Sequence, residues 1–226
     1  MSSERGRYHL DIEKIRAFLP HRAPFLLVDR ILEIHPRGDS SKLDLANGAE
    51  LVGTKVVGIK NFTYNEPFIP GHFPGYSIVP GVIQIEAMAQ VASFALYPFL
   101  EGKPESERGF QCILVGVDGV RFRKPVIPGD TLRVEAELTK ARGKIWGFHV
   151  EGFVDGQRVV VGGIVAVLLR DGARHQCTES EQVLGLGHVL HQHLVRHVDD
   201  RTGARIGIHG SCIVPEAEGG LPQQRR

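Results

Sequence analysis

Residues 82–97 read VIQIEAMAQVASFALY, and this stretch decides the fold that we expect for the chain. Apolar residues occupy most faces of a helix drawn through it, so we expect a helix that is largely buried. Pro80 lies where a helix start tolerates proline, and Pro98 limits the helix end. The remaining sequence must therefore supply the layer that covers this helix.

Strand patterns lie on both sides of the helix. Phe25–Ile34 and Leu43–Asn61 precede it, and four more strands are expected at about 111–123, 131–142, 144–155 and 157–170. Gly143 and the Asp155-Gly156 pair are typical of hairpin turns between the last three strands. Because strands and helices do not alternate, a parallel doubly wound sheet is disfavoured. We expect an α+β fold in which a curved antiparallel sheet wraps around one long central helix.

Composition narrows the class of protein. The chain has 226 residues, of which 42% are hydrophobic and 23% charged, which suits a globular domain with an appendage. A net charge of +1 favours neither nucleic acid nor a membrane surface as a partner. The three cysteines (Cys112, Cys177, Cys212) form no CxxC motif, so we expect a reducing compartment. Glu86 and Gln90 interrupt the most apolar stretch, and the polar N-terminus lacks a signal-peptide core; we therefore expect a cytoplasmic protein without a membrane span.

Aromatic residues divide the chain into two regions. Residues 1–170 contain every Phe, Tyr and Trp, and we expect them to form the domain, beginning with a short helix at Ile12–Phe18 capped by Asp11. Residues 171–226 contain no aromatic residue and are rich in histidine, so we expect a flexible extension. If this extension were helical, it could bind zinc or nickel, but no supporting partner is evident, and no metal site is predicted. The histidines concerned are His188, His191, His193 and His197.

The central helix carries two polar residues on one face. Glu86 and Gln90 are one turn apart and therefore neighbours. Burial would raise the pKa of the Glu86 carboxyl group and keep part of it protonated near neutral pH, as a general acid requires. The alternative is a structural glutamate that is satisfied by the backbone or by a partner subunit.

The loop before the helix favours a catalytic role over a purely structural one. It contains Gly71-His72-Phe73-Pro74-Gly75, in which His72 can act as a base near neutral pH. Gly81 would let a ligand approach the backbone N–H at the positive end of the helix. A base, an acid and an oxyanion donor would thus meet at a carbonyl compound, an arrangement suited to moving a proton beside a thioester carbonyl.

The stretch NEPFIPGHFPGYSIVPGVIQIEAMAQ (65–90) closely resembles the (3R)-3-hydroxyacyl-acyl-carrier-protein dehydratases of bacterial fatty acid synthesis. HRAPFLLVDRI (21–31) is similar to the opening strand motif of that family, and VDGVRFRKPVIPGDTL (117–132) to its return strand. The resemblance covers residues 8–170 and implies a hotdog fold. It also implies a homodimer, or a hexamer built from dimers, in which the catalytic His and Glu come from opposite subunits.

The resemblance assigns roles to particular residues. His72 would remove a proton from C2, and Glu86 would protonate the departing C3 hydroxyl group, with no cofactor required. The Gly81 N–H would bind the thioester oxygen, the Ile78 carbonyl would hold the His72 ring, and Gln90 would orient Glu86. Phe73 and Val82 would contact the substrate. A glutamate at position 86, where the related isomerising branch has aspartate, favours simple dehydration.

Several residues depart from the family pattern. Ser77 replaces a usual proline, Ile69 a usual phenylalanine, and Ala23 a usual aromatic residue. Tyrosine, which the family often has near the tunnel, is missing at Cys112 and Ile113. These differences, with the C-terminal extension, favour a specialised pathway such as polyketide or secondary lipid synthesis.

The expected partner is an acidic acyl carrier protein that delivers the substrate on a phosphopantetheine arm. Arg121, Arg123 and Lys124 would dock it, although basic residues on an exposed strand need no partner. Two other functions remain open: a hotdog acyl thioesterase, which would release free thiol, and a non-catalytic subunit of a dehydratase complex.

Overall fold

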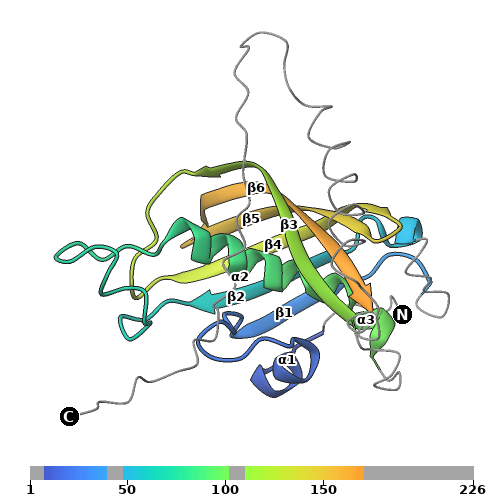
Figure 1. Cartoon of the computed structure of the whole chain (residues 1–226), viewed down its shortest axis with the longest axis horizontal. Coiled ribbons are helices and arrows are strands. Elements are labelled where there is room, and N and C mark those ends of the chain that lie inside the picture. The colour runs from blue at the N-terminus through green and yellow to red at the C-terminus, as the bar shows by residue number, and fades with distance from the viewer. Residues whose placement is uncertain (1–7, 40–47, 102–109, 171–226) are drawn as a thin grey trace, which may run out of the picture. The chain divides into compact units, whose positions relative to one another are not determined.

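The computed structural model of the chain describes residues 8–39, 48–101 and 110–170 (Figure 1). They belong to the first of two units, Met1–Gln176. The second unit, Cys177–Arg226, lies outside the described residues, as does the whole extension expected at 171–226.

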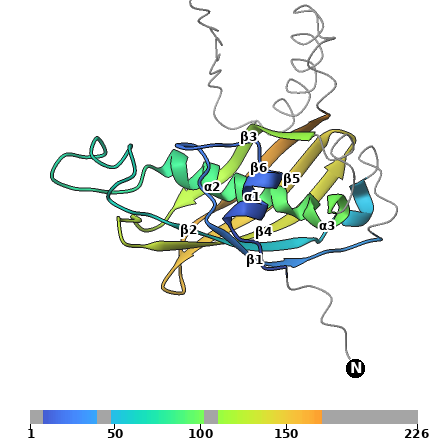
Figure 2. The ribbon, with the colours of Figure 1, turned by 90° about the horizontal axis from the view of Figure 1, so that it is seen from below.

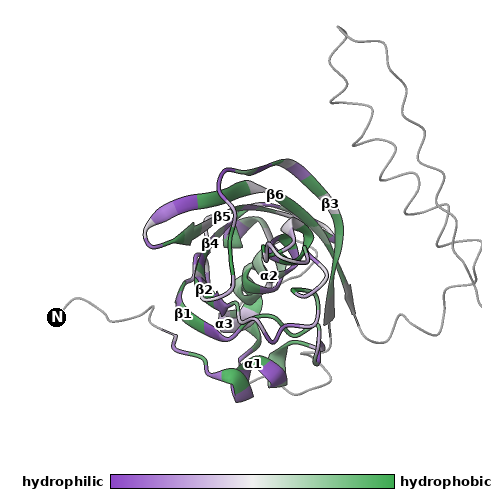
Figure 3. Ribbon diagram, turned by 90° about the vertical axis from the view of Figure 1, so that its left-hand side faces the viewer, coloured by the Kyte–Doolittle hydropathy of each residue, from purple (hydrophilic) through white to green (hydrophobic). Residues whose placement is uncertain are grey.

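A single six-stranded antiparallel sheet forms the body of the first unit. Its order is β1-β2-β4-β5-β6-β3, so β1 and β3 are the two edge strands. The sheet curves around helix α2 (Gly81–Ser93), which confirms the expected α+β architecture (Figures 1 and 3). The strands are β1 (Arg30–His35), β2 (Lys55–Asn61), β3 (Phe110–Phe122), β4 (Thr131–Arg142), β5 (Ile145–Val154) and β6 (Gln157–Arg170).

Helix α2 packs closely on the sheet. Met88 and Val91 are fully buried, and a Cβ atom at Gly58 of β2 would lie 2.9 Å from the Val91 side chain, so a glycine is needed there. The helical path continues through η3 (Phe94–Leu96) and α3 (Tyr97–Leu100). By length and composition alone, Gly81–Leu100 could span a membrane, but 61% of its apolar window is buried inside the protein, as in a core helix.

Helix α1 (Ile12–Phe18) lies next to edge strand β1 (Figures 1 and 2). The Asp11 side chain accepts a hydrogen bond from the Lys14 N–H at 3.1 Å, which is the expected N-cap. The Phe18 ring packs at a tilt against that of Phe94 in η3, with ring centroids 4.7 Å apart. This packing holds the segment that follows α1 against the central helix.

Two predicted strands begin later than expected. The Phe25 and Leu26 N–H groups donate to the Arg22 carbonyl in a turn, so β1 starts only at Arg30. The segment before β2 contains a 3-10 helix, η2 (Gly48–Leu51), so β2 starts at Lys55. The predicted hairpins β4–β5 and β5–β6 are confirmed, with Gly143, Asp155 and Gly156 all at positive φ.

Candidate active site

A cavity of about 360 Å³ lies between helix α2 and the sheet. It is lined by Phe18 at the end of α1, by the segment Leu19–His21 that follows, and by Cys112, Ile113 and Leu114 of edge strand β3. Phe148, Ile164 and Ala166 of β5 and β6 form its apolar floor. Glu86, Ala89, Gln90 and Ser93 of α2 also line it. The cavity therefore has a mostly apolar lining and one carboxyl group.

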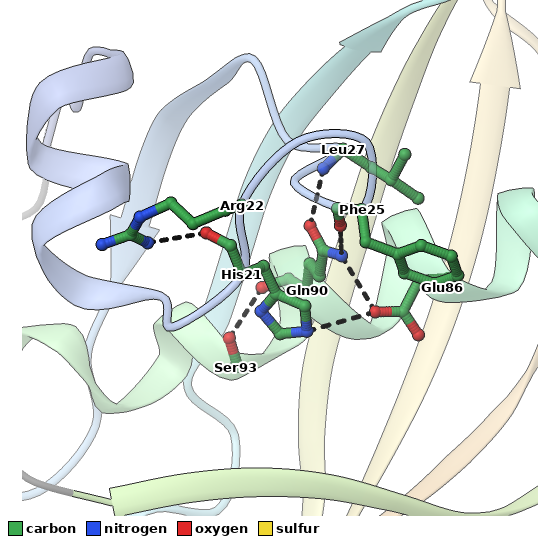
Figure 4. A network of polar contacts seen from close by, with 7 residues as sticks. All are labelled: His21, Arg22, Phe25, Leu27, Glu86, Gln90 and Ser93. Atoms are coloured by element: carbon green, nitrogen blue, oxygen red, sulfur yellow. Dashed lines mark hydrogen bonds and ion pairs between the residues drawn. The ribbon is translucent and has the colours of Figure 1, made fainter. Parts of the chain in front are cut away.

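Glu86 belongs to a network of polar contacts (Figure 4). The Gln90 amide donates to Glu86 Oε1 at 2.9 Å, and His21 Nε2 lies 3.4 Å from the same oxygen. Gln90 also accepts from the Leu27 N–H at 2.9 Å and donates to the Phe25 carbonyl at 2.7 Å. Gln90 thus ties the carboxyl group to the loop between α1 and β1.

The electrostatics of this network correct one prediction. The hydrogen bond from His21 lowers the pKa of the Glu86 carboxyl group below its ordinary value, helped by Gln90, and together they outweigh the opposing effect of burial. Glu86 is therefore ionised at neutral pH in the free protein, and the expectation that burial keeps it partly protonated is wrong. Burial and the nearby Glu86 charge raise the pKa of the Cys112 thiol to about 12, so that thiol is neutral and unreactive.

His72 lies in the long loop between β2 and α2. Its Nδ1 is 3.0 Å from the Ile78 carbonyl oxygen, and its ring stacks on Phe73 with centroids 4.2 Å apart. Because a carbonyl only accepts, Nδ1 carries the hydrogen and donates it, which leaves the Nε2 lone pair of the neutral ring available as a base. The Ile78 N–H donates in turn to the His72 carbonyl at 3.0 Å.

A buried ion pair supports the base of this loop. Lys60 Nζ of β2 lies 2.5 Å from Glu66 Oε1, and their side chains are only 8% and 15% exposed. The Glu66 carbonyl accepts from the Ile69 N–H, and the Ile69 carbonyl accepts from the His72 N–H, both at 3.0 Å. Successive turns therefore connect the ion pair to His72.

The start of helix α2 is open to solvent on one side. The N–H groups of Gly81 and Val82 have no acceptor within the helix, because they belong to its first turn. A Cβ atom at Gly81 would lie 2.6 Å from the Phe122 ring, so the helix start and β3 are in close contact. Val82 and Phe73 are 71% and 52% exposed, which leaves both free to meet another molecule.

The structure brings together only some of the predicted site residues. Glu86 and Gln90 share the cavity, whereas His72 is not among its lining residues. In the described part of a single chain, no hydrogen bond or ion pair joins His72 to Glu86. The basic residues Arg121, Arg123 and Lys124 lie at the end of β3, and Lys124 bonds to Gln157. Among the described residues, no group of His, Cys, Asp and Glu is arranged to hold a metal ion.

Comparison with known proteins places the chain in a family. A family model described as a FabA-like domain matches residues 19–162. The chain is also 49% identical, over 136 residues, to a 3-hydroxyacyl-[acyl-carrier-protein] dehydratase FabZ from Desulforamulus reducens, a match that covers 60% of this chain and 81% of the relative. The chain belongs to the FabZ-type hotdog dehydratase family. A FabZ from Myxococcus xanthus is 41% identical, with 71% of this chain and 92% of the relative covered.

A solved structure supports the hotdog fold of this family member. It is the dehydratase heterocomplex ApeI:P from Xenorhabdus doucetiae, matched with a TM-score of 0.53 at 18% identity. The match covers 70% of this chain and 92% of the other chain. At this identity the likeness concerns the fold alone.

His21 lies at the site of this family member, but it is not among the residues predicted from the sequence. It lines the cavity and contacts Glu86, although 65 positions separate the two in sequence. The signal was its place at the head of the HRAPFLLVDRI motif, directly after the proline that ends α1. A resemblance alone does not say which member of such a motif points into the site.

Proposed function

We propose that this chain removes water from (3R)-3-hydroxyacyl thioesters bound to acyl carrier protein and produces trans-2-enoyl thioesters. The observation that carries the proposal is the ionised Glu86 carboxylate at a cavity whose lining is mostly apolar. An apolar cavity suits an acyl chain, and a single carboxylate suits its one hydroxyl group. The 49% identity to a FabZ dehydratase supports the same reaction.

His72 is the base in the proposed reaction. The Nε2 lone pair, left free by the contact between Nδ1 and Ile78, takes the proton from C2. The C2–H electron pair forms the C2–C3 double bond while the C3–O bond breaks. Gly81, whose N–H is unpaired within the helix, would stabilise the negative charge on the thioester oxygen, and such a donor contributes about 3–4 kcal/mol in other enzymes.

Glu86 orients the leaving group. Since the carboxyl group is ionised, it accepts a hydrogen bond from the C3 hydroxyl group. The proton that leaves with this oxygen then comes from the His72 imidazolium, which obtained it from C2. One proton is removed and one is delivered, so the site returns to its starting state after water departs.

Two copies of the chain would build each site. Within one chain His72 does not line the cavity that holds Glu86, and the cavity is bounded by edge strand β3. We infer a homodimer, alone or assembled into a hexamer, in which His72 of one copy reaches the cavity of the other. Phe73 and Val82 would then contact the substrate near the shared boundary.

Arg121, Arg123 and Lys124 would attract the acidic carrier protein, in keeping with the relatives named as acyl-carrier-protein enzymes. The chemistry needs no cofactor, because the thioester itself acidifies C2. A cytoplasmic location follows from that partner. Residues 171–226 are proposed to be a flexible extension.

The decisive experiment measures loss of one water molecule from 3-hydroxyacyl thioesters of graded chain length by mass spectrometry. We expect His72→Ala and Glu86→Gln each to reduce turnover at least ~100-fold, because each removes a group that acts on a proton or on the leaving oxygen. His149→Ala, which changes an exposed histidine of β5, is the control. Full activity in either site variant would contradict the proposal, and release of free thiol would indicate a thioesterase.

A further inference from the structure

His21 contacts Glu86 directly, yet the dehydration chemistry described above assigns it no task. It lies in the turn that follows α1, and its ring points at the carboxyl group across the cavity wall (Figure 4). The distance from His21 Nε2 to Glu86 Oε1 is 3.4 Å. The His21 side chain is 29% exposed and that of Glu86 is 22% exposed, so water screens their contact only partly.

The two partners of Glu86 meet the same oxygen atom. Both His21 Nε2 and the Gln90 amide lie at Oε1, whereas Oε2 points away from both of them (Figure 4). A carboxylate has lone pairs on both oxygens, so Oε2 keeps its full capacity to accept. This one-sided arrangement is what a carboxylate needs in order to receive a substrate hydroxyl group on its other oxygen.

The surroundings of His21 settle which ring nitrogen donates. Nδ1 is buried and has no hydrogen-bond partner among the described residues. A hydrogen on Nδ1 would therefore be a buried donor without an acceptor, whereas a hydrogen on Nε2 has an oxygen of the Glu86 carboxylate 3.4 Å from its nitrogen. The neutral ring thus carries its hydrogen on Nε2 and serves as a donor to Oε1.

The backbone that carries His21 is itself held in place. Arg22 Nη1 donates to the carbonyls of Leu19 and His21, at 2.9 and 2.6 Å. The guanidinium group is therefore engaged with the turn rather than with Glu86. Of the residues that line the cavity, the titratable ones are His21, Glu86 and Cys112, and the thiol is neutral at ordinary pH.

We propose that His21 is a positioning residue for the dehydration, which donates from Nε2 to Oε1 of Glu86 so that the carboxyl group is held with Oε2 open to the C3 hydroxyl group. The inference rests on the proposed function. His21 touches no reacting atom in this arrangement and acts through Glu86 alone. With Gln90 it forms a pair of donors that approach Glu86 from two different elements, the turn after α1 and helix α2.

The test compares His21→Phe, which removes the donor, with His21→Gln, whose amide can replace Nε2–H. Loss of a hydrogen bond to a charged group should lower kcat of the Phe variant about 10- to 100-fold with little change in KM, and the Gln variant should recover part of that loss. His21 lowers the pKa of Glu86, so its removal raises that pKa. Because the mechanism also needs a neutral His72, the acid limb of the kcat/KM profile contains two steps, and the step due to Glu86 should move to higher pH in the Phe variant and less in the Gln variant.

His35→Phe is the matched control, because His35 of edge strand β1 also contacts a glutamate, Glu33 Oε2 at 3.0 Å, but through more exposed side chains that do not line the cavity. It should leave kcat and the pH profile unchanged. Wild-type kcat and an unmoved acid limb in His21→Phe would overturn the inference, as would a loss of activity that follows thermal unfolding alone. If His21→Phe fails to fold, His21→Ala takes its place beside His21→Gln: a lower kcat in the Ala variant than in the Gln variant sustains the donor role, and an equal kcat and acid limb in the two variants overturn it. An inactive wild-type protein would instead refute the proposed function.

Discussion

Gln90 is a single side chain that satisfies three partners at the site. It pairs with the Leu27 N–H, the Phe25 carbonyl and Glu86 Oε1, and it is only 2% exposed. Buried backbone groups that lose their partners are costly, so Gln90 has a structural task besides orienting Glu86. The loop before β1 runs over the helix because the Gln90 amide forms hydrogen bonds with its backbone.

We expect Gln90→Leu to lower the free energy of unfolding by about 2–4 kcal/mol, since it leaves two backbone groups near the core without a hydrogen-bond partner. Gln84→Leu is the matched control. Gln84 is equally buried on the same helix, but its Oε1 has no partner in the described part of the chain, and its one bond, to the Val79 carbonyl, is 3.3 Å long. That variant should change stability by less than about 1 kcal/mol. Urea denaturation measures both, and equal losses would contradict the argument.

At this scale the sequence indicates candidate site residues but not their charge states. His72 and Glu86 could be singled out from local patterns, because a histidine between prolines and a carboxylate in an apolar helix are unusual. The direction of the Glu86 pKa shift could not be predicted, because it depends on His21, which is distant in sequence and near only after the fold has formed. The apolar pattern of the helix predicts that Glu86 is buried, but it does not show the His21 donor whose effect on the pKa outweighs that of burial.

Among the elements, the loop between β2 and α2 depends most on its anchor. Lys60 and Glu66 form a buried ion pair at its base, and the Lys60 ammonium also lies 5.5 Å from the Phe62 ring centroid. From Glu66 two successive turns lead to His72, past Ile69, which is fully buried. The position of the base therefore depends on a contact far from the chemistry.

Lys60→Met should lower the free energy of unfolding by about 3 kcal/mol, because it leaves the Glu66 carboxylate buried without its partner. The double variant Lys60→Met/Glu66→Leu should regain most of that stability, since no unpaired charge remains. Lys55→Met is the control: Lys55 pairs with Glu137 at 3.4 Å on the exposed surface, and its loss should cost less than about 1 kcal/mol. Chemical denaturation checks all three, and a stable Lys60→Met protein would show that the pair does not hold the loop.

The elements with strong periodicity and turn signals were predicted well, and those shaped by distant contacts were not. Helix α1, helix α2 and the hairpins of β4, β5 and β6 follow local sequence. The late start of β1 does not, because the Arg22 turn and the Gln90 side chain take the backbone donors of Phe25–Leu27 that a strand would have used. An apolar run alone cannot show that its N–H groups have other partners.

At the scale of the whole molecule, edge strand β3 presents an apolar surface. Ile113, Leu114, Val117 and Phe122 are each between 38% and 49% exposed in the single chain. A long edge strand with apolar side chains invites pairing with another chain. Because the same strand bounds the cavity and contacts the start of α2 through Phe122, a second copy seated on it would lie beside the site.

If His72 and Glu86 of one site come from different copies, two inactive variants should rescue each other. A mixed dimer of His72→Ala and Glu86→Gln chains contains one site with both defects and one site with neither. Random re-association of equal amounts makes half of the dimers mixed, so activity should return to about one quarter of the wild-type value. Each variant re-associated with itself is the control and should stay inactive. Turnover of the mixture measures the outcome, and no recovery despite proven subunit exchange would mean that both residues act within one chain.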